Sequence, residues 1–289
     1  MATAEDAAVS HDWNLKGYAM KLEGAQIEQY YRDGFLQFPD LLSADEVAVL
    51  RREVARVSKI DCDMVVREGE GRVPKAMFRM HESDGPTASG PFYAAVRLAR
   101  TLGVAQQLLG DDRLYLHHTK VNIKAAIEGS VWPWHQDYGS WARDGIAKPH
   151  LLTLMISLDA AEEINGCLYF LPGSHRHGRL DPYLDTSTAY KVWSVGPADM
   201  KRLIAEHGEP VPILGRPGSA VIFDCNLLHA SGHNLSAQDR WQAYFCYNTV
   251  ANRPSDVENP RPDWVRSRNW IPLAVVNDDS IRARAPAMA

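Results

Sequence analysis

Short apolar runs dominate the second half of the chain. They have the length and the β-branched or aromatic content of strands, and most are bounded by Gly, Pro, Asn or Asp. The runs are RLYLHHTKVNIK, HLLTLMISLDA, GCLYFLPG, SAVIFDC and WQAYFCYNTV. No helical pattern alternates with them, which argues against a doubly wound sheet. Residues beyond about 110 are therefore predicted to form a jelly-roll or barrel closed by turns.

The first half of the chain has helical periodicity instead. The pattern over residues 22–33 predicts a helix, and GFLQFPDLL behind it predicts a short strand and a turn. Ser43, with Glu46 three residues later, is a capping-box signature that predicts the start of a second helix. A further helical stretch is expected over residues 91–109.

The polar, glycine-rich segment over residues 61–90 is predicted to be a long loop or lid. The expected organisation is an N-terminal arm (1–21), one domain over 22–252 and a C-terminal extension (253–289). Within that domain, a helical part runs to about residue 110 and the β-rich core starts at about 111.

Composition narrows the class of partner. The 289 residues are 45% hydrophobic and 23% charged with a net charge of −5, so a globular protein is expected without a basic surface for nucleic acid or acidic membranes. No apolar run approaches the roughly 18 residues of a membrane span, and the first residues are acidic, unlike a signal peptide. The four cysteines form no CxxC pair. We therefore expect a cytoplasmic protein that acts on a small molecule. The sequence is compatible with a monomer and with a homo-oligomer.

The candidate chemistry starts in WPWHQDYGSWARDG. His135 and Asp137 flank one residue, and positions i and i+2 of a strand share a face, so both side chains can reach one metal. This spacing alone is common by chance. A second histidine, His229, ends the run SAVIFDCNLLH, and Arg240 follows eleven residues later. Two histidines and a carboxylate form the facial triad of non-haem Fe(II) oxygenases.

With these residues, the chain resembles the phytanoyl-CoA dioxygenase family of Fe(II)/2-oxoglutarate oxygenases and is similar to its ectoine-hydroxylase-like branch. The shared segments are GFLQFPDLLSADEV, WHQDYGSWARDG, NGCLYFLPGSHRHG, and the distal His229 with Arg240, between residues 26 and 250. The expected fold is mainly β with flanking helices, around a double-stranded β-helix (jelly-roll, cupin-like) core. The resemblance implies Fe(II), 2-oxoglutarate and O2, with hydroxylation or another oxidation of an unactivated C–H bond and release of succinate and CO2.

The resemblance also implies roles for individual residues. His135, Asp137 and His229 match the iron ligands, and Arg240 matches the arginine that holds the far carboxylate of 2-oxoglutarate, for which its planar fork is suited. Positions that line the co-substrate pocket are matched by Asn122, Thr153 and Ser231, and an aromatic position near the substrate is matched by Trp141. The presence of Asp137 favours hydroxylation over halogenation.

Other features bear on the substrate. Ectoine hydroxylases have an acidic, aromatic stretch after the metal motif and a glutamine at the position of His118, whereas here Tyr138-Gly139-Ser140 follow the motif, which argues against ectoine. Alternation along the strand puts His118, Lys120, Asn122 and Lys124 on one side. If that side faces the interior, it favours an anionic substrate or helps to hold 2-oxoglutarate; if it faces outward, it is a solvated edge.

Trp132 and Trp141 are further candidates for the wall of the site, and Arg79, in the predicted lid, is a candidate substrate contact. His175, His177 and His233 are predicted to be structural or solvent-facing.

Two alternatives stay open: a zinc hydrolase that uses the same three side chains, and a non-catalytic jelly-roll binding protein. The first leaves Arg240 without a role and lacks the helical HExxH pattern.

Overall fold

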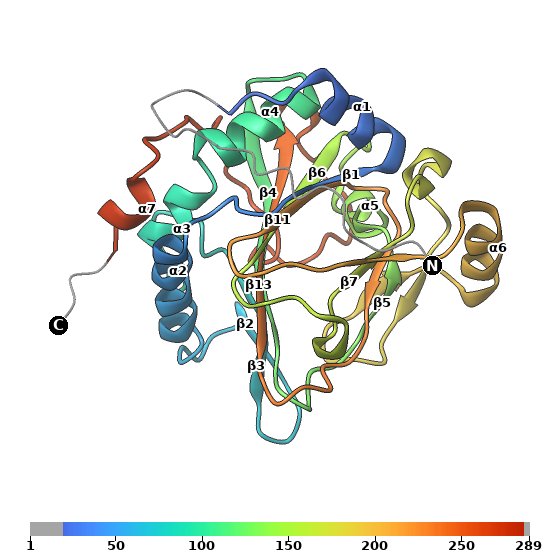
Figure 1. Cartoon of the computed structure of the whole chain (residues 1–289), viewed down its shortest axis with the longest axis horizontal. Coiled ribbons are helices and arrows are strands. Elements are labelled where there is room, and N and C mark those ends of the chain that lie inside the picture. Colours follow the sequence, from blue (N-terminus) through green and yellow to red (C-terminus); the bar gives the residue numbers. More distant parts are fainter. Residues whose placement is uncertain (1–19, 286–289) are drawn as a thin grey trace, which may run out of the picture.

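Two antiparallel sheets form the centre of the computed structural model, which describes residues 20–285 (Figure 1). In spatial order, the larger sheet contains β1 (Phe35–Phe38), β11 (Ala220–Asp224), β6 (Leu151–Ser157), β13 (Arg240–Thr249), β4 (Leu114–Lys124), β3 (Val73–Phe78) and β2 (Val65–Glu68). The smaller sheet contains β10 (Val211–Ile213), β7 (Leu168–Phe170), β12 (His229–Ser231), β5 (Trp132–His135), β9 (Val192–Ser194) and β8 (Tyr183–Asp185).

Most helices flank the larger sheet (Figure 1). They are α1 (Gly24–Asp33), α2 (Ala44–Val57), α3 (Gly90–Ala95), the π-helical turn η1 (Ala99–Gly103), α4 (Val104–Leu109) and α7 (Ser280–Ala283); α5 (Asp137–Trp141) and α6 (Pro197–His207) lie elsewhere. Short 3₁₀ turns complete the set: η2 (Ala142–Asp144), η3 (Glu163–Asn165), η4 (Ser174–His177) and η5 (Val250–Asn252). The chain is mainly β with flanking helices around a jelly-roll core, as predicted.

The larger sheet is buried on both faces, which explains its long apolar runs. In β6, Leu152, Leu154 and Ile156 pack in the cluster shared with the helices, whereas Met155 packs in a second cluster between the two sheets. Since side chains alternate along a strand, Thr153 faces the same inter-sheet space as Met155. The predicted site residue therefore lies in the interior.

A bulge in β4 determines which of its residues face that interior. Along β13, Cys246 pairs with His118 but Tyr247 pairs with Leu116, so His117 is the extra residue. Leu116 belongs to the cluster under the helices, and the bulge turns His118 to the opposite face although it is only two residues away. The structure therefore turns His118, Lys120, Asn122 and Lys124 towards the interior, which is the first of the two alternatives.

The sequence signals for helix starts are confirmed locally. The Ser43 hydroxyl accepts a hydrogen bond from the Glu46 backbone N–H, and the Glu46 carboxylate accepts one from the Ser43 backbone N–H. The predicted helix over 91–109 is interrupted at residues 96–98, between α3 and η1.

The prediction of a long loop over residues 61–90 is wrong for its first part, where β2 and β3 form a hairpin at the edge of the larger sheet. Two of its charged residues, Glu68 and Lys75, are turned inward, whereas Glu70 and Arg72 at the turn are exposed. Lys75, which is 1% exposed, donates to Glu68 at 2.8 Å and also contacts Ser130. Because Glu68 on the neighbouring strand neutralises the charge of Lys75 once the hairpin has formed, the local polarity gave a misleading signal.

Several elements between residues 178 and 215 were not predicted: β8, β9, β10 and α6. The strands have only three residues each and carry no usable periodicity.

The C-terminal segment returns to the helices. The Leu273 N–H donates to the carbonyl of Leu114, Val276 forms a bridge with Leu98, and Ile281 of α7 is fully buried. The predicted N-terminal arm lies almost entirely outside the described residues. Within residues 20–285, no helix combines the length and the apolar character needed to cross a membrane.

Candidate metal and co-substrate site

Two histidines face each other on neighbouring strands of the smaller sheet. His135, the last residue of β5, pairs directly with His229, the first residue of β12. The Nε2 atoms of both histidines lie 3.9 Å from Oδ1 of Asp137, so the three side chains converge on one point. The histidines are 6% and 4% exposed. The structure thus brings together the three residues of the predicted triad.

The route by which Asp137 reaches this point differs from the sequence prediction. Strand β5 ends at His135, Gln136 is still extended, and Asp137 is the first residue of helix α5. The two side chains therefore do not share the face of one continuous strand. The Gln136 side chain holds this turn, because it donates to the carbonyls of Gly178 and Asn226 and accepts from the N–H of Leu180.

The protonation of the histidines suits metal ligation. Burial, with the neighbouring His229, lowers the pKa of His135 to about 3, and burial also lowers the pKa of His229, so both imidazoles are neutral. Their Nδ1 atoms lie 2.7 and 2.9 Å from the carbonyls of Pro133 and Leu227. A carbonyl can only accept, so Nδ1 carries the proton and each Nε2 offers a lone pair to the centre of the triad.

Asp137 supplies the negative charge. Burial alone would raise the pKa of its carboxyl group, but the nearby charge of Lys120 and the hydrogen bond from Thr153 favour the ionised form, and the pKa is lowered below its usual value. The Thr153 hydroxyl donates to Oδ2 at 3.0 Å, which leaves Oδ1 directed at the histidines. Two neutral imidazoles and one carboxylate match the donor set of a non-haem Fe(II) site.

Arg240 is a buried cation that lacks an acidic partner. It begins β13, is 1% exposed, and donates to the carbonyl of Gly166 at 2.9 Å and to the Gln242 side chain. Within residues 20–285, no carboxylate pairs with its guanidinium, and its Nε has no hydrogen-bond partner. A buried, unpaired charge is costly, so this position is suited to an anionic ligand.

Glycine is required where Arg240 meets the hairpin. Gly166 has φ +74°, and an added Cβ would lie 2.7 Å from the carbonyl oxygen of Gly232. The NGC turn of the sequence motif therefore places a carbonyl against the guanidinium in a space that larger side chains cannot occupy.

Other polar atoms around Arg240 also lack partners. Lys124, opposite Arg240 on β4, is not one of them, because its ammonium donates to the carbonyls of Ser130 and Gly232; burial, with the nearby Arg240, lowers its pKa to about 6. Among the described residues, Asn122 Oδ1, Ser231 Oγ and Gln242 Nε2 are buried without a hydrogen-bond partner. Since buried polar groups are normally satisfied, this concentration of free donors and acceptors fits a small polar molecule such as 2-oxoglutarate.

Next to the triad, the interior contains the cation Lys120 and several aromatic rings. The Lys120 ammonium lies 4.4 Å from the ring centre of Trp132 and 5.3 Å from that of Tyr244, and its charge acts on Asp137. Tyr190 packs against Trp132 with ring centroids 5.4 Å apart. The predicted candidates Trp132 and Lys120 thus lie beside the triad.

The remaining candidates, His118, Trp141 and Arg79, contact other parts of the chain. His118 Nδ1 lies 2.5 Å from the carbonyl of Val265, and Trp141 is 1% exposed in a small apolar cluster that includes Cys246. Arg79 pairs with Glu82 at 3.1 Å. Contacts of these three residues with a substrate remain predictions.

Sequence reasoning missed several residues of this interior. Gln242 and Tyr244 follow Arg240 at a period of two along β13 and were detectable by alternation. Tyr190 and Arg261 lie outside the regular elements and gave no local signal. Arg261 binds the fully buried Asp144 with both Nε and Nη2, and Tyr190 packs nearby. Burial would raise the pKa of Asp144, but Arg261 and His117 hold it well below its usual value.

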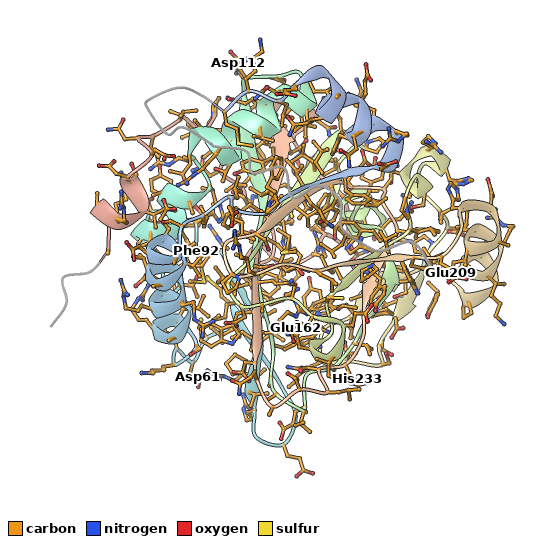
Figure 2. All side chains as sticks on the ribbon, in the orientation of Figure 1. Asp61, Phe92, Asp112, Glu162, Glu209 and His233 are labelled. Carbon is orange, nitrogen blue, oxygen red and sulfur yellow. The ribbon has the colours of Figure 1, made fainter. Side chains whose placement is uncertain are left out.

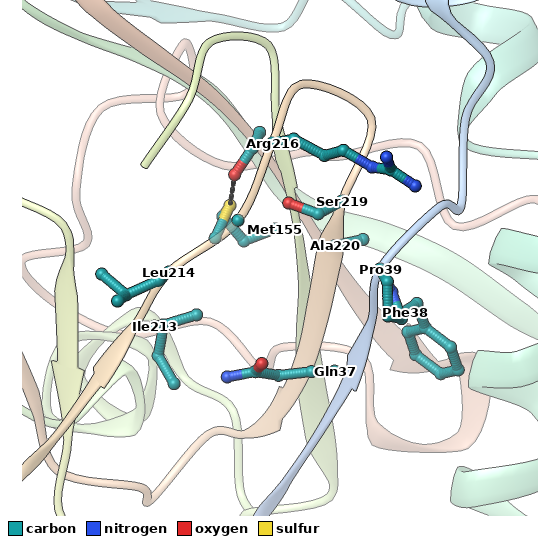
Figure 3. Close-up of a pocket in the computed structure, with 11 residues that line it drawn as sticks. Gln37, Phe38, Pro39, Met155, Ile213, Leu214, Arg216, Ser219 and Ala220 are labelled. Atoms are coloured by element: carbon teal, nitrogen blue, oxygen red, sulfur yellow. Dashed lines mark hydrogen bonds between the residues drawn. The ribbon is translucent and has the colours of Figure 1, made fainter. Parts of the chain in front are cut away.

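Two other features lie away from the triad. His175 Nε2 is 3.1 Å from the carbonyl of Tyr31, in agreement with its predicted structural role, and His233 is exposed. Figure 3 shows a pocket lined by residues of β1, among them Gln37, by the ends of β6, β10 and β11, and by the connection from β10 to β11, which includes Leu214 and Arg216. None of the predicted site residues lines it.

Comparisons with known proteins agree with this geometry. The family model described as phytanoyl-CoA dioxygenase matches residues 30–241. An ectoine dioxygenase of Nocardia farcinica is 31% identical over 268 residues, covering 88% of each chain. An L-proline trans-4-hydroxylase of Streptomyces griseoviridis is 33% identical over 264 residues, covering 88% of this chain and 96% of the relative.

A solved structure is similar over the same extent. EctD of S. alaskensis with bound Fe has a TM-score of 0.75 and 30% identity, covering 88% of this chain and 87% of that chain. The same protein has also been solved with 2-oxoglutarate and 5-hydroxyectoine. The match of the family model over most of the β core, together with full-length relatives above 30% identity, shows that this chain belongs to the phytanoyl-CoA dioxygenase family.

Proposed function

We propose that the protein is an Fe(II)/2-oxoglutarate-dependent dioxygenase that hydroxylates an unactivated C–H bond of a small, carboxylate-bearing metabolite, with release of succinate and CO2. The observation that carries this proposal is the pairing of the buried triad with the unpaired guanidinium of Arg240. Relatives named as dioxygenase and hydroxylase, and a related structure with Fe, support the same chemistry.

In this proposal, Nε2 of His135, Nε2 of His229 and Oδ1 of Asp137 hold the ferrous ion. Bound Fe(II), with 2-oxoglutarate and O2, supplies the oxidising power that C–H cleavage needs. The residues of this chain supply position: the carbonyls of Pro133 and Leu227 fix the imidazole tautomers, and Thr153 orients the carboxylate.

Arg240 holds the far carboxylate of 2-oxoglutarate in this scheme, with Asn122, Thr153 and Ser231 along the same pocket. The free Nε of Arg240 and the free hydroxyl of Ser231 are the groups that such a ligand would satisfy. Because both are buried, the ligand exchanges water for charge-assisted hydrogen bonds in a dry environment, where these bonds are strongest.

Lys120 is proposed to bind the carboxylate of the primary substrate. It lies four residues from Lys124 along β4, which corresponds to about 13 Å at the rise of a strand, so the two cations do not share one carboxylate of the co-substrate. The rings of Trp132 and Tyr244 form an apolar wall around it. Ectoine and L-proline, which two relatives are named for, are small cyclic molecules with one carboxylate.

The test is a measurement of succinate formed from 2-oxoglutarate with Fe(II), O2 and a panel of cyclic and linear amino acids, ectoine and other small carboxylates. We expect substrate-dependent succinate and a product heavier by one oxygen atom. Absence of turnover with every compound, together with tight Zn²⁺ binding and hydrolytic activity, would contradict the proposal in favour of a zinc hydrolase. Binding of carboxylates with no turnover would favour the non-catalytic alternative.

A further inference from the structure

A second cluster of potential metal ligands lies outside the triad. His177 is the last residue of η4, and Glu206 and His207 are the last two residues of α6. Figure 1 shows α6 at the edge of the molecule, on the side opposite α2 and α7. Nothing in the proposed reaction uses these three residues.

The ligand atoms of this cluster converge. The Nε2 atoms of His177 and His207 lie 2.7 Å apart, and Glu206 Oε1 lies 3.5 Å from the first and 3.9 Å from the second. With zinc–nitrogen and zinc–oxygen bonds near 2.0–2.2 Å, two ligands of a tetrahedral site are about 3.4 Å apart, and the three distances bracket this value.

The electrostatic surroundings favour a cation at this point. Helix α6 ends at His207, where its last carbonyl groups carry partial negative charge. Arg202 pairs with the other oxygen of Glu206, Oε2, at 3.6 Å, which leaves Oε1 directed at the imidazoles. The Arg176 guanidinium donates through Nη1 to the carbonyl of Arg32 at 2.8 Å, and its Nη2 approaches the Nδ1 side of the His207 ring.

We propose that His177, Glu206 and His207 bind Zn²⁺ or a similar borderline divalent cation, with the fourth position open to water. The site joins the C-terminus of α6 to η4. Since His175 and Arg176 of η4 already bond to the carbonyls of Tyr31 and Arg32, the metal connects α6 through η4 to the end of α1. The cation stabilises this corner of the fold and takes no part in oxidation.

The experiment is a calorimetric Zn²⁺ titration of the full, tag-free, metal-free chain. We expect two sites in the wild type. One should be lost in His207→Ala and the other in His135→Ala, with neither left in the double variant. Loss of an outer-shell partner already lowers metal affinity about 10- to 100-fold, so His177→Ala should weaken its site by at least about tenfold. The matched control is His233→Ala, an exposed histidine well separated from the end of α6, where Glu209 lies (Figure 2).

A second measurement is independent of stoichiometry. In the His135→Ala background, Zn²⁺ should raise the thermal unfolding midpoint by several degrees, and His207→Ala should abolish that shift. Equal shifts with and without His207 would overturn the proposal. Zn²⁺ binding that is fully retained in His207→Ala would also overturn it, since the histidines would then form a simple hydrogen-bonded pair. These outcomes do not depend on whether the triad supports turnover.

Discussion

His135 and His229 lie directly opposite each other on β5 and β12, with ring centroids 4.0 Å apart. Antiparallel pairing therefore fixes their separation, and Asp137 completes the group from the start of α5. The metal geometry thus rests on backbone hydrogen bonds of the smaller sheet, which hold it more rigidly than side-chain contacts alone would.

The triad gives the first prediction. Asp137→Ala removes the only negative ligand proposed for Fe(II), and we expect 2-oxoglutarate turnover to fall by at least about a hundredfold, beyond the 10- to 100-fold typical of outer-shell losses. Thr153→Val keeps all three ligands and removes the hydroxyl that bonds to Oδ2 and contacts the Cys246 sulfur, so it should cause the smaller effect. Succinate release at saturating Fe(II) is the measurement. Unchanged activity in Asp137→Ala would show that the iron lies elsewhere.

Arg240 gives the second prediction. Arg240→Ala removes charge-assisted hydrogen bonds to the co-substrate, and a loss of about 1.5–3 kcal/mol raises KM for 2-oxoglutarate by about 10- to 100-fold. Steady-state kinetics with varied 2-oxoglutarate check this expectation, and added guanidinium should restore part of the activity. A variant that loses thermal stability while its KM stays unchanged would assign Arg240 a purely structural role.

Lys120 gives the third prediction, which distinguishes the substrate pocket from the co-substrate pocket. Lys120→Met keeps much of the side-chain volume against Trp132 but removes the charge, so we expect KM for a carboxylate substrate to rise about tenfold, as for one lost charged hydrogen bond. KM for 2-oxoglutarate should stay the same, and Lys120→Arg should retain most of the activity. A change in KM for 2-oxoglutarate alone would place Lys120 in the co-substrate pocket instead.

Asp224 predicts a pH dependence of stability. Burial raises the pKa of its carboxyl group to about 6, against 3.8 for the free side chain, so the folded protein retains a proton that the unfolded chain releases. This contribution is present below pH 4 and is lost as the pH rises through 6, by about 3 kcal/mol in total.

Asp224→Asn keeps an acceptor for the Asn226 N–H, which lies 2.7 Å from Oδ1. The variant should therefore unfold at higher denaturant concentration than the wild type at pH 7.5, and the difference should shrink towards pH 4. Parallel pH profiles for the two proteins would contradict the buried carboxyl group as the cause.

Local signals predicted the parts of the fold that depend on neighbours in sequence. The cap at Ser43 and the strands that contain Thr153 and Arg240 are examples, because their patterns span a few residues. The hairpin of β2 and β3 was missed because the charge of Lys75 is neutralised by Glu68 only once the chain has folded.

The candidate site also contains residues that local motifs predicted and residues that they did not. The triad residues and Arg240 stood in recognisable motifs, and the structure brings His135, Asp137 and His229 together. The position of Asp137 on a helix was not foreseen, since spacing alone does not tell where β5 ends. Arg261 contacts Asp144 across 117 residues, and no short pattern encodes such a contact.

The contact of Arg261 with Asp144 also limits how far the chain can be shortened. The family match stops at residue 241, and a fragment ending at Asn252 would still contain all the strands of both sheets. It would nevertheless enclose a carboxylate without its cation, next to the bulge at His117. The segment around Arg261 is thus part of the interior of the folded domain, and any truncation or fusion at this boundary would have to preserve that arginine.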